Sequence, residues 1–147
     1  MRAMTERYQA RVAVYLLLFR GTSVLLSRRF QTGFADGLYG LPSGHVEKGE
    51  MATEAIIRET AEEVGLTIHP NDVQCVHVMH RQSKDADYMD VVFLLRAWKG
   101  EPINAEPEKC DDLRWFSVDD LPANTLPSVK QMITCVRQGI LYSEWRH

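Results

Sequence analysis

The chain of 147 residues lacks a long hydrophobic run and carries little net charge of either sign. Its longest apolar stretch, VAVYLLLF within Arg11–Phe19, is far shorter than the roughly 20 residues that a helix needs to cross a bilayer. A formal net charge of −3 gives no general attraction to nucleic acid or to an anionic membrane surface. We therefore expect neither a membrane nor a nucleic-acid polymer as a partner.

Cysteine is also scarce, and its placement excludes two further classes. Cys75, Cys110 and Cys135 are odd in number and far apart, so the sequence indicates neither a disulfide framework nor a zinc-ligand pair. Buried, reduced thiols in a cytoplasmic protein are the expectation. The N-terminus has no convincing secretory pattern of charged start, apolar middle and small-residue cleavage site. We expect residues 1–9 to be a flexible segment of a single domain that spans residues 1–147.

The pattern of apolar residues predicts a mixture of strands and helices. Strands are expected at Arg11–Phe19, Ser23–Arg29, Val73–His80, Met89–Trp98 and Asp112–Ser117, and helices at Ala52–Val64 and Pro127–Gly139. Strands stand before and after a helix without regular alternation, which predicts a mixed α/β sandwich rather than a doubly wound sheet. The first helix should bury Thr53, Ile57, Ala61 and Val64. The apolar tail Ile140–Trp145 should pack on its own core or on a partner.

The first predicted helix carries an unusual concentration of negative charge. Glu59, Glu62 and Glu63 lie within about one turn, where like charges destabilise a helix, and Arg58 is the only basic residue in 51–66. A solvated surface is the ordinary interpretation of such a face. Here the helix directly follows a loop that contains Gly44, and this loop could present a carbonyl oxygen to the same point. Oxygen ligands of this kind suit a hard dication such as Mg²⁺, which is commonly shared with substrate phosphates.

The same segment resembles the Nudix box, Gly-x5-Glu-x7-Arg-Glu-U-x-Glu-Glu-x-Gly-U, in which U is aliphatic. The matching residues are Gly44, Glu50, Arg58, Glu59, Glu62, Glu63, Gly65 and Leu66. Thr60 departs from the motif at the first U position, and its methyl group could still face the core. Outside the box, GLYGLPSGHVEKGE and Arg114–Phe116 also look like the family, so the resemblance covers roughly Arg11 to Gly139.

The resemblance implies a Nudix-type α/β/α sandwich with a mixed sheet between helices. It also implies hydrolysis of a pyrophosphate bond in a nucleoside diphosphate linked to another moiety, with Mg²⁺, or alternatively Mn²⁺, as cofactor. The implied metal ligands are the carbonyl oxygen of Gly44 and the carboxylates of Glu59, Glu62 and Glu63. Glu59 is the first candidate for the base that takes the proton of the attacking water. Arg58 would orient the cluster by pairing with Glu50 or Glu62.

A later acidic loop, EPEKCDD at Glu106–Asp112, could supply a further ligand or base. Glu108 is the preferred candidate, and Asp111 and Asp112 are alternatives. A polar surface loop is about as good an explanation for any one of these residues.

Four residues are candidates for contacting the substrate. Phe34 and Tyr39 could stack on a base, and Arg28 could reach a phosphate, although packing or solvated surface is the more common role of each residue type. Asn124 lies in DDLPANTLPSVKQMI, which resembles the MutT-type branch in which an Asn contacts an oxidised guanine. A turn or helix-capping Asn explains this residue equally well.

The leading hypothesis is a MutT-like hydrolase of nucleoside triphosphates that releases a monophosphate and pyrophosphate. The alternative enzyme is a pyrophosphatase for nucleotide sugars or other diphosphate-linked nucleotides. A non-catalytic Nudix-like sensing domain is a third hypothesis, although such domains usually lose acidic box residues. The isomerase branch of the fold depends on a cysteine, and none lies near the box in sequence. The expected partner is a small nucleotide substrate, with a homodimer as an open alternative.

Overall fold

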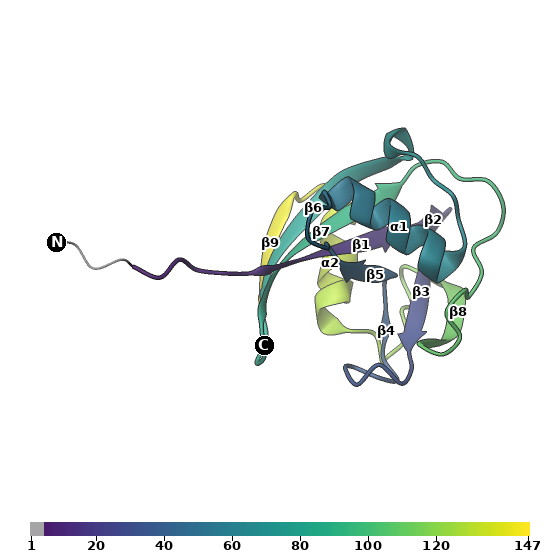
Figure 1. Cartoon of the computed structure of the whole chain (residues 1–147). Coiled ribbons are helices and arrows are strands. Elements are labelled where there is room, and N and C mark those ends of the chain that lie inside the picture. Colours follow the sequence, from purple (N-terminus) through teal and green to yellow (C-terminus); the bar gives the residue numbers. More distant parts are fainter. Residues whose placement is uncertain (1–4) are drawn as a thin grey trace.

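The computed structural model describes residues 5–147. In chain order its elements are β1 (Arg11–Leu17), β2 (Phe19–Arg20), β3 (Ser23–Arg29), β4 (Tyr39–Gly40), β5 (Ser43–His45), α1 (Ala52–Val64), a 3-10 turn η1 (Pro70–Asp72), β6 (Val73–Gln82), β7 (Asp87–Leu95), β8 (Cys110–Ser117), α2 (Pro127–Arg137) and β9 (Tyr142–Arg146) (Figure 1). The predicted helix at Ala52–Val64 and strand at Ser23–Arg29 are confirmed with the same bounds. Strand β6 continues two residues beyond the predicted end at His80. Strand β7 begins two residues before Met89 and ends at Leu95 rather than Trp98.

The strands form two sheets. A five-stranded sheet has the order β5-β1-β7-β6-β9, and a second sheet pairs β3 with β2, β4 and β8. The larger sheet is mixed, since β1 is antiparallel to β5 and parallel to β7. In the smaller sheet β2 and β3 form an antiparallel hairpin. The predicted strand Arg11–Phe19 is therefore divided, since β1 ends at Leu17 and belongs to the larger sheet.

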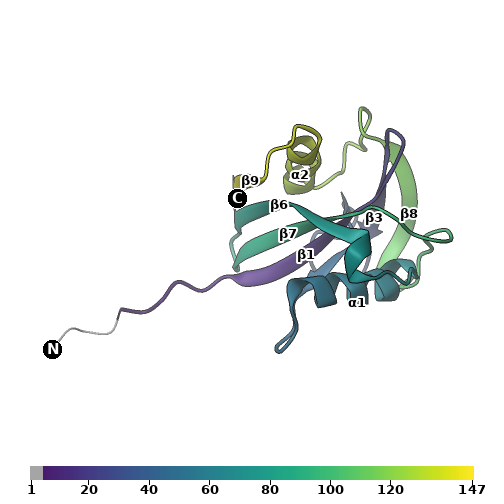
Figure 2. The ribbon, with the colours of Figure 1, turned by 90° about the horizontal axis from the view of Figure 1, so that it is seen from above.

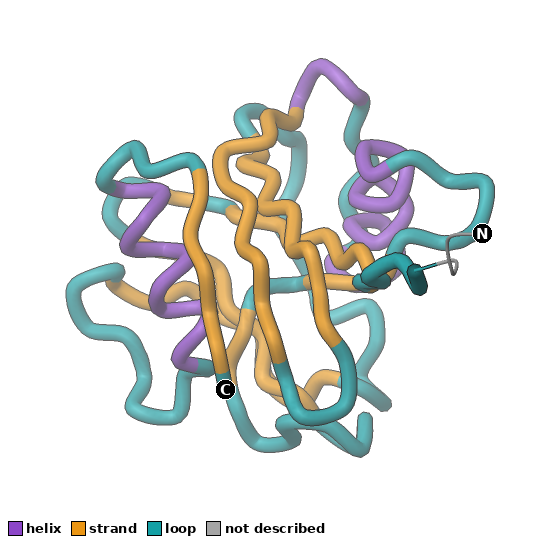
Figure 3. The backbone as a smooth tube through the Cα atoms, turned by 90° about the vertical axis from the view of Figure 1, so that its left-hand side faces the viewer, coloured by secondary structure: helices purple, strands orange, loops and turns teal. Residues whose placement is uncertain are grey.

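The two helices cover opposite sides of the strands, so the predicted α/β/α sandwich is confirmed (Figures 2 and 3). Alternation along β1 explains the arrangement, because neighbouring side chains of a strand point to opposite faces. Val14 and Leu16 pack in one buried cluster with Ile56 of α1. Leu17 packs in a second cluster with Met132 of α2.

Helix α1 has the predicted bounds but turns a different face to the core. Its buried residues are Ala55, Ile56, Thr60 and Val64, whereas Thr53 and Ile57 are half-buried and Ala61 is exposed. The hydroxyl of Thr60 donates to the carbonyl oxygen of Ile56 at 2.6 Å, which removes the cost of burying it. Gly65 ends the helix in the left-handed conformation, with φ of 69°.

The C-terminal tail is a strand, β9, and it packs on its own chain. It lies parallel to β6 at the edge of the larger sheet. The buried His77 of β6 holds the approach to β9 through the carbonyl oxygen of Ile140 at 2.8 Å and through Ser143 Oγ at 2.7 Å. The pattern of Tyr142–Arg146 was too short and too mixed to be recognised as a strand.

The N-terminal segment is described only in part, and the cysteines depart from the sequence expectation. Residues 1–4 of the expected flexible segment lie outside the described residues, and residues 5–10 form no helix or strand. Of the thiols expected to be buried, Cys135 is buried, Cys110 is half-buried and Cys75 is exposed. The register of β6 against β7 shifts between Cys75 and the buried His77. None of the helices in residues 5–147 has the length and apolar character needed to cross a membrane.

Candidate active site

The loop between β5 and α1 brings Gly44 against the acidic face of the helix. A Cβ atom added to Gly44 would lie 2.1 Å from Cδ of Glu59, a distance that real Cβ atoms do not adopt. Only glycine at position 44 allows the backbone of this loop to approach the Glu59 carboxylate so closely. The predicted meeting of the glycine loop and the helix is present in the structure.

Arg58 is the centre of the acidic cluster. Its Nε and Nη2 donate to the two carboxylate oxygens of Glu50 at 2.8 and 3.0 Å. Its Nη1 donates to Glu59 at 2.7 Å and to Glu62 at 3.3 Å. The hydrogen bonds from Arg58 lower the pKa of Glu50 to about 2. The sequence left Glu50 and Glu62 as alternative partners of Arg58, and the structure pairs it with both and with Glu59.

Glu63 is the one carboxylate of the cluster with an unsatisfied buried oxygen. Among the described residues, Oε2 of Glu63 is the only buried side-chain oxygen or nitrogen without a hydrogen-bond partner. Burial raises the pKa of Glu63 to about 8, and the charges of Glu59 and Glu106 add to this effect. A buried oxygen without a hydrogen-bond partner is costly, and Glu63 lines the cavity described below.

The late acidic loop contributes Glu106, not Glu108. Glu106 lines the cavity described below, whereas Glu108 is exposed and does not line it. A turn explains this, since the amides of Lys109 and Cys110 both donate to the carbonyl oxygen of Glu106. Asp111 is paired with Arg28 at 2.7 Å and Asp112 with Arg114 at 2.8 Å. The sequence alone could not tell which of these four neighbouring acids faces the cavity, because that depends on the turn that precedes β8.

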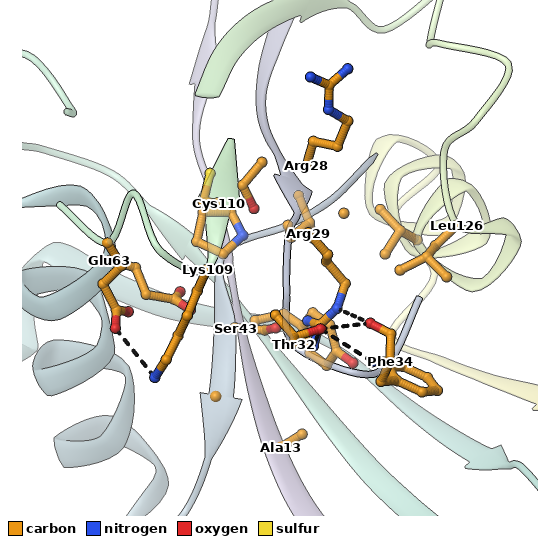
Figure 4. A pocket seen from close by; sticks show the side chains of 18 of the residues that line it. Ala13, Arg28, Arg29, Thr32, Phe34, Ser43, Glu63, Lys109, Cys110 and Leu126 are labelled. Carbon is orange, nitrogen blue, oxygen red and sulfur yellow. Dashed lines mark hydrogen bonds and ion pairs between the residues drawn. The ribbon is translucent and has the colours of Figure 1, made fainter. Parts of the chain in front are cut away.

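A cavity of about 320 Å³ opens beside this cluster. Its walls come from β1, β3, β5, β6, β7, the end of α1, the 31–38 loop, the start of α2 and the late loop. Figure 4 shows part of this lining. The acidic end holds Glu63 and Glu106, and Lys109 lies 3.5 Å from Glu106.

The four predicted substrate residues divide into two pairs. Phe34 and Arg28 line the cavity, although Figure 4 shows the Arg28 guanidinium directed away from Phe34. Tyr39 does not line it: the residue is only 5% exposed, its hydroxyl donates to Asp112, and its ring packs edge-on against Phe116. Asn124 does not line it either, and its amide donates to the carbonyl oxygen of Gly37 at 2.8 Å. The structure thus places Tyr39 and Asn124 outside the cavity walls, and the stacking role of Tyr39 and the base contact of Asn124 stay predictions.

The chemistry of the site fits a hard cation, but the carboxylates are not gathered into a finished cage. Within residues 5–147, no group of three or more His, Cys, Asp or Glu side chains is arranged to hold a metal ion. Glu59 is held by Arg58, and Glu62 is exposed. The donors themselves are all oxygens, and the buried oxygen of Glu63 lacks a partner. The residues present thus suit a dication that would complete the cluster.

An acidic helix behind a glycine loop, inside an α/β/α sandwich, defines a class of hydrolase fold. A family model described as the NUDIX domain matches residues 7–135. The chain therefore belongs to the Nudix family, as the box residues predicted.

Individual relatives and structures agree with this assignment. The chain is 33% identical over 111 residues to a protein named NAD-capped RNA hydrolase NudC from Stutzerimonas stutzeri, covering 76% of this chain and 38% of that protein. It thus spans less than half the length of the curated relatives that it matches. A crystal structure titled MutT NUDIX hydrolase from Burkholderia pseudomallei has a TM-score of 0.79 and 28% identity, covering 86% of this chain and 98% of that one.

A third similarity concerns the fold alone. It is to a bifunctional NMN adenylyltransferase/ADP ribose pyrophosphatase from Francisella tularensis, whose crystal structure is complexed with AMP and a Mn ion. The TM-score is 0.68 at 22% identity, covering 92% of this chain and 43% of that one.

Proposed function

We propose that this chain hydrolyses a pyrophosphate bond in a nucleoside diphosphate linked to another moiety. The observation that carries the proposal is the buried, partnerless oxygen of Glu63 beside the contact between Gly44 and Glu59. A dication held by these residues, by Glu62 and by the carbonyl oxygen of Gly44 would satisfy that oxygen. When bound, Mg²⁺ or Mn²⁺ supplies neutralisation of the diphosphate charge and polarisation at phosphorus.

The protein side chains have separate roles in this proposal. Glu59 takes the proton of the attacking water, since burial raises the pKa of Glu59 and so makes its carboxylate a stronger base. Arg58 orients the cluster through its bonds to Glu50 and Glu59. Glu106 replaces Glu108 as the candidate ligand or base from the late loop, because it reaches the cavity.

Nucleoside triphosphates are the leading substrate class, with a monophosphate and pyrophosphate as products. The cavity volume lies at the lower end of the range of small-molecule sites, which suits one nucleoside. Phe34 stands at its edge with 56% of its surface exposed, so a ring face is available for stacking. The MutT NUDIX hydrolase from Burkholderia pseudomallei supports this class by its similarity over nearly its whole length.

A diphosphate-linked nucleotide is the second candidate class. The observation that favours it is the similarity to proteins named NAD-capped RNA hydrolase NudC. The chain spans less than half of the length of those proteins, so we carry over only the broad class of diphosphate-linked nucleotides.

The experiment is a release assay with Mg²⁺ or Mn²⁺ in which pyrophosphate reports on triphosphates. Diphosphate-linked compounds give two monophosphates instead, so their cleavage is followed by the phosphate that added alkaline phosphatase frees from these products. The panel contains nucleoside triphosphates with ordinary and oxidised bases, nucleotide sugars, ADP-ribose, NAD and dinucleoside polyphosphates. We expect turnover of one class, and a loss of several orders of magnitude in Glu63→Gln.

The matched control is Glu54→Gln, on the same helix. Glu54 is exposed, and its Oε1 accepts a hydrogen bond from the amide of Met51, which a glutamine oxygen retains. Near-normal turnover in Glu63→Gln, or no turnover of any compound by the unaltered chain, would contradict the proposal.

A further inference from the structure

A buried ion pair lies on the larger sheet, in the wall of the same cavity. Asp90 of β7 is completely buried and Arg81 of β6 is 9% exposed. Arg81 donates from Nε to one carboxylate oxygen of Asp90 at 2.6 Å and from Nη2 to the other at 3.1 Å. This two-point geometry fixes the plane of the guanidinium. The acidic cluster of the proposed reaction uses neither residue.

The remaining nitrogen of this guanidinium is free to bind a ligand. Nη2 also donates to the hydroxyl of Tyr15 at 3.3 Å. Nη1 makes no hydrogen bond to another residue of the described chain, yet it is not among the buried atoms that lack a partner. Arg81 lines the cavity, and Nη1 is its one nitrogen without a hydrogen bond to another described residue. A nine-tenths buried arginine thus offers two N–H donors to whatever enters.

Aromatic rings hold Arg81 in place. The guanidinium carbon lies 4.2 Å from the centre of the Tyr88 ring, and His45 stacks on that ring at 5.7 Å with an interplanar angle of 18°. Both rings belong to residues that line the cavity. A donor on such a rigid support loses little conformational freedom when it binds.

Charge indicates what kind of group Nη1 would recognise. Asp90 neutralises Arg81 within the protein, so the positive charge that could attract a phosphate lies at Arg29, which also lines the cavity, rather than at Arg81. The cavity lining also has an apolar part, which includes Leu41, Leu126 and Val129. A neutral, flat ring with a hydrogen-bond acceptor on its edge suits these surroundings better than an anion.

We propose that Arg81 determines base specificity by donating from Nη1 to a carbonyl oxygen on the edge of an oxo-bearing nucleobase, such as hypoxanthine, guanine or uracil. Adenine presents an amino group at the corresponding position, and two donors would then face each other. The proposal rests on the proposed function for the presence of a nucleotide, and it adds which bases are accepted.

Nucleoside monophosphates test this directly, because they carry the base but contain no pyrophosphate bond. Inosine and adenosine 5′-monophosphates differ at the C6 substituent, and calorimetric titration in Mg²⁺ compares their dissociation constants. The unaltered chain should prefer the inosine compound roughly tenfold, as expected for one hydrogen bond to a charged donor.

Two variants remove the proposed donor without leaving Asp90 unpaired. In Arg81→Lys, a single ammonium pairs with Asp90, and the planar Nη1 is lost. In the double variant Arg81→Gln with Asp90→Asn, two amides replace the ion pair. Both should bring the ratio of dissociation constants close to one, whereas Arg96→Lys, an exposed arginine that follows β7, should leave it unchanged.

The failure of this inference is distinguishable from failure of the proposed hydrolysis. Equal binding of both compounds by the unaltered chain, binding of neither, or an unchanged ratio in folded Arg81 variants would overturn the role of Arg81. Circular dichroism and the melting temperature establish that the variants are folded. A preference that depends on Arg81, without turnover of any compound in the release assay, would instead overturn hydrolysis and leave the base assignment standing.

Discussion

At the scale of single residues, the chain satisfies one buried carboxylate and leaves another open. Asp90 is fully buried, and Arg81 binds both of its oxygens. Glu63 has a buried oxygen that no described residue contacts through a hydrogen bond. Structural acids are normally paired, whereas strained or unpaired acids gather at functional sites. The lack of a hydrogen-bond partner therefore marks Glu63 as a candidate reactive residue, whereas Asp90 holds Arg81 in position.

The close approach of Gly44 to Glu59 leads to a prediction for Gly44→Ala. The backbone there does not require glycine, so the added methyl group acts only by displacing the Glu59 carboxylate. We expect turnover to fall by at least tenfold, because both proposed metal ligands shift, and the free energy of unfolding to fall by about 1 kcal/mol. Initial rates and urea unfolding measure the two effects.

A double-mutant cycle provides the control. In a Glu59→Ala background the methyl group added at position 44 meets no carboxylate, so Gly44→Ala should cost little stability there. An equal cost in both backgrounds would show that the added methyl group acts elsewhere.

At the scale of elements, the 31–38 loop is held in place by local bonds. Asp36 accepts hydrogen bonds from the amides of Thr32 and Gly33, and Arg29 donates to the carbonyl oxygen of Phe34 at 2.7 Å. The amide of Asn124 provides the connection from this loop to the segment that precedes α2. The loop positions Phe34 at the cavity. We therefore expect a change in the rigidity of the loop to affect substrate binding.

Asn124→Ala should therefore loosen the loop without changing base preference. Its amide bonds Gly37 and its side chain does not line the cavity. We expect faster amide hydrogen exchange at Gly37 and Leu38, a higher KM and an unchanged ratio of rates between bases. Hydrogen exchange and steady-state kinetics measure these effects, with the exposed Asn71→Ala as control. An altered base preference would return Asn124 to the substrate pocket.

The elements also show what local sequence can predict. Helix α1 was predictable because Gly65 ends it and no proline interrupts it. Its buried face was not, since Thr60 reads as polar until its hydroxyl is seen to bond within the helix. Strand β9 escaped prediction because its stability comes from pairing with β6 and from the bonds of His77, both far away in sequence.

At the scale of the whole molecule, the box was predictable and the rest of the site was not. The spacing from Gly44 to Leu66 is local, so its residues meet through one loop and one helix. Glu106 and Arg81 reach the cavity only because β8 and β6 belong to different sheets that enclose it. Such placement depends on the register of strands, and no local pattern encodes it.

The charge of the site should couple metal binding, pH and global stability. The pKa of Glu63 is about 8 in the folded chain, above its ordinary value of 4.5. Between these values the unfolded chain has released this proton and the folded chain retains it. The stability that protonated Glu63 contributes to the folded chain is therefore fully present below about pH 4.5 and is lost as the pH rises through 8.

In EDTA, we expect Glu63→Gln to be more stable than the unaltered chain at pH 8, by on the order of 2 kcal/mol, and the difference to vanish near pH 4.5. Mn²⁺ or Mg²⁺ at pH 8 should raise the melting temperature of the unaltered chain and should raise that of Glu63→Gln much less, because binding to the folded state stabilises it. Thermal unfolding across this pH range measures both effects, with Glu54→Gln as the matched control. A stability difference that does not change with pH would mean that Glu63 is solvated like an ordinary surface acid. Equal stabilisation of both chains by the ion would place the metal away from Glu63.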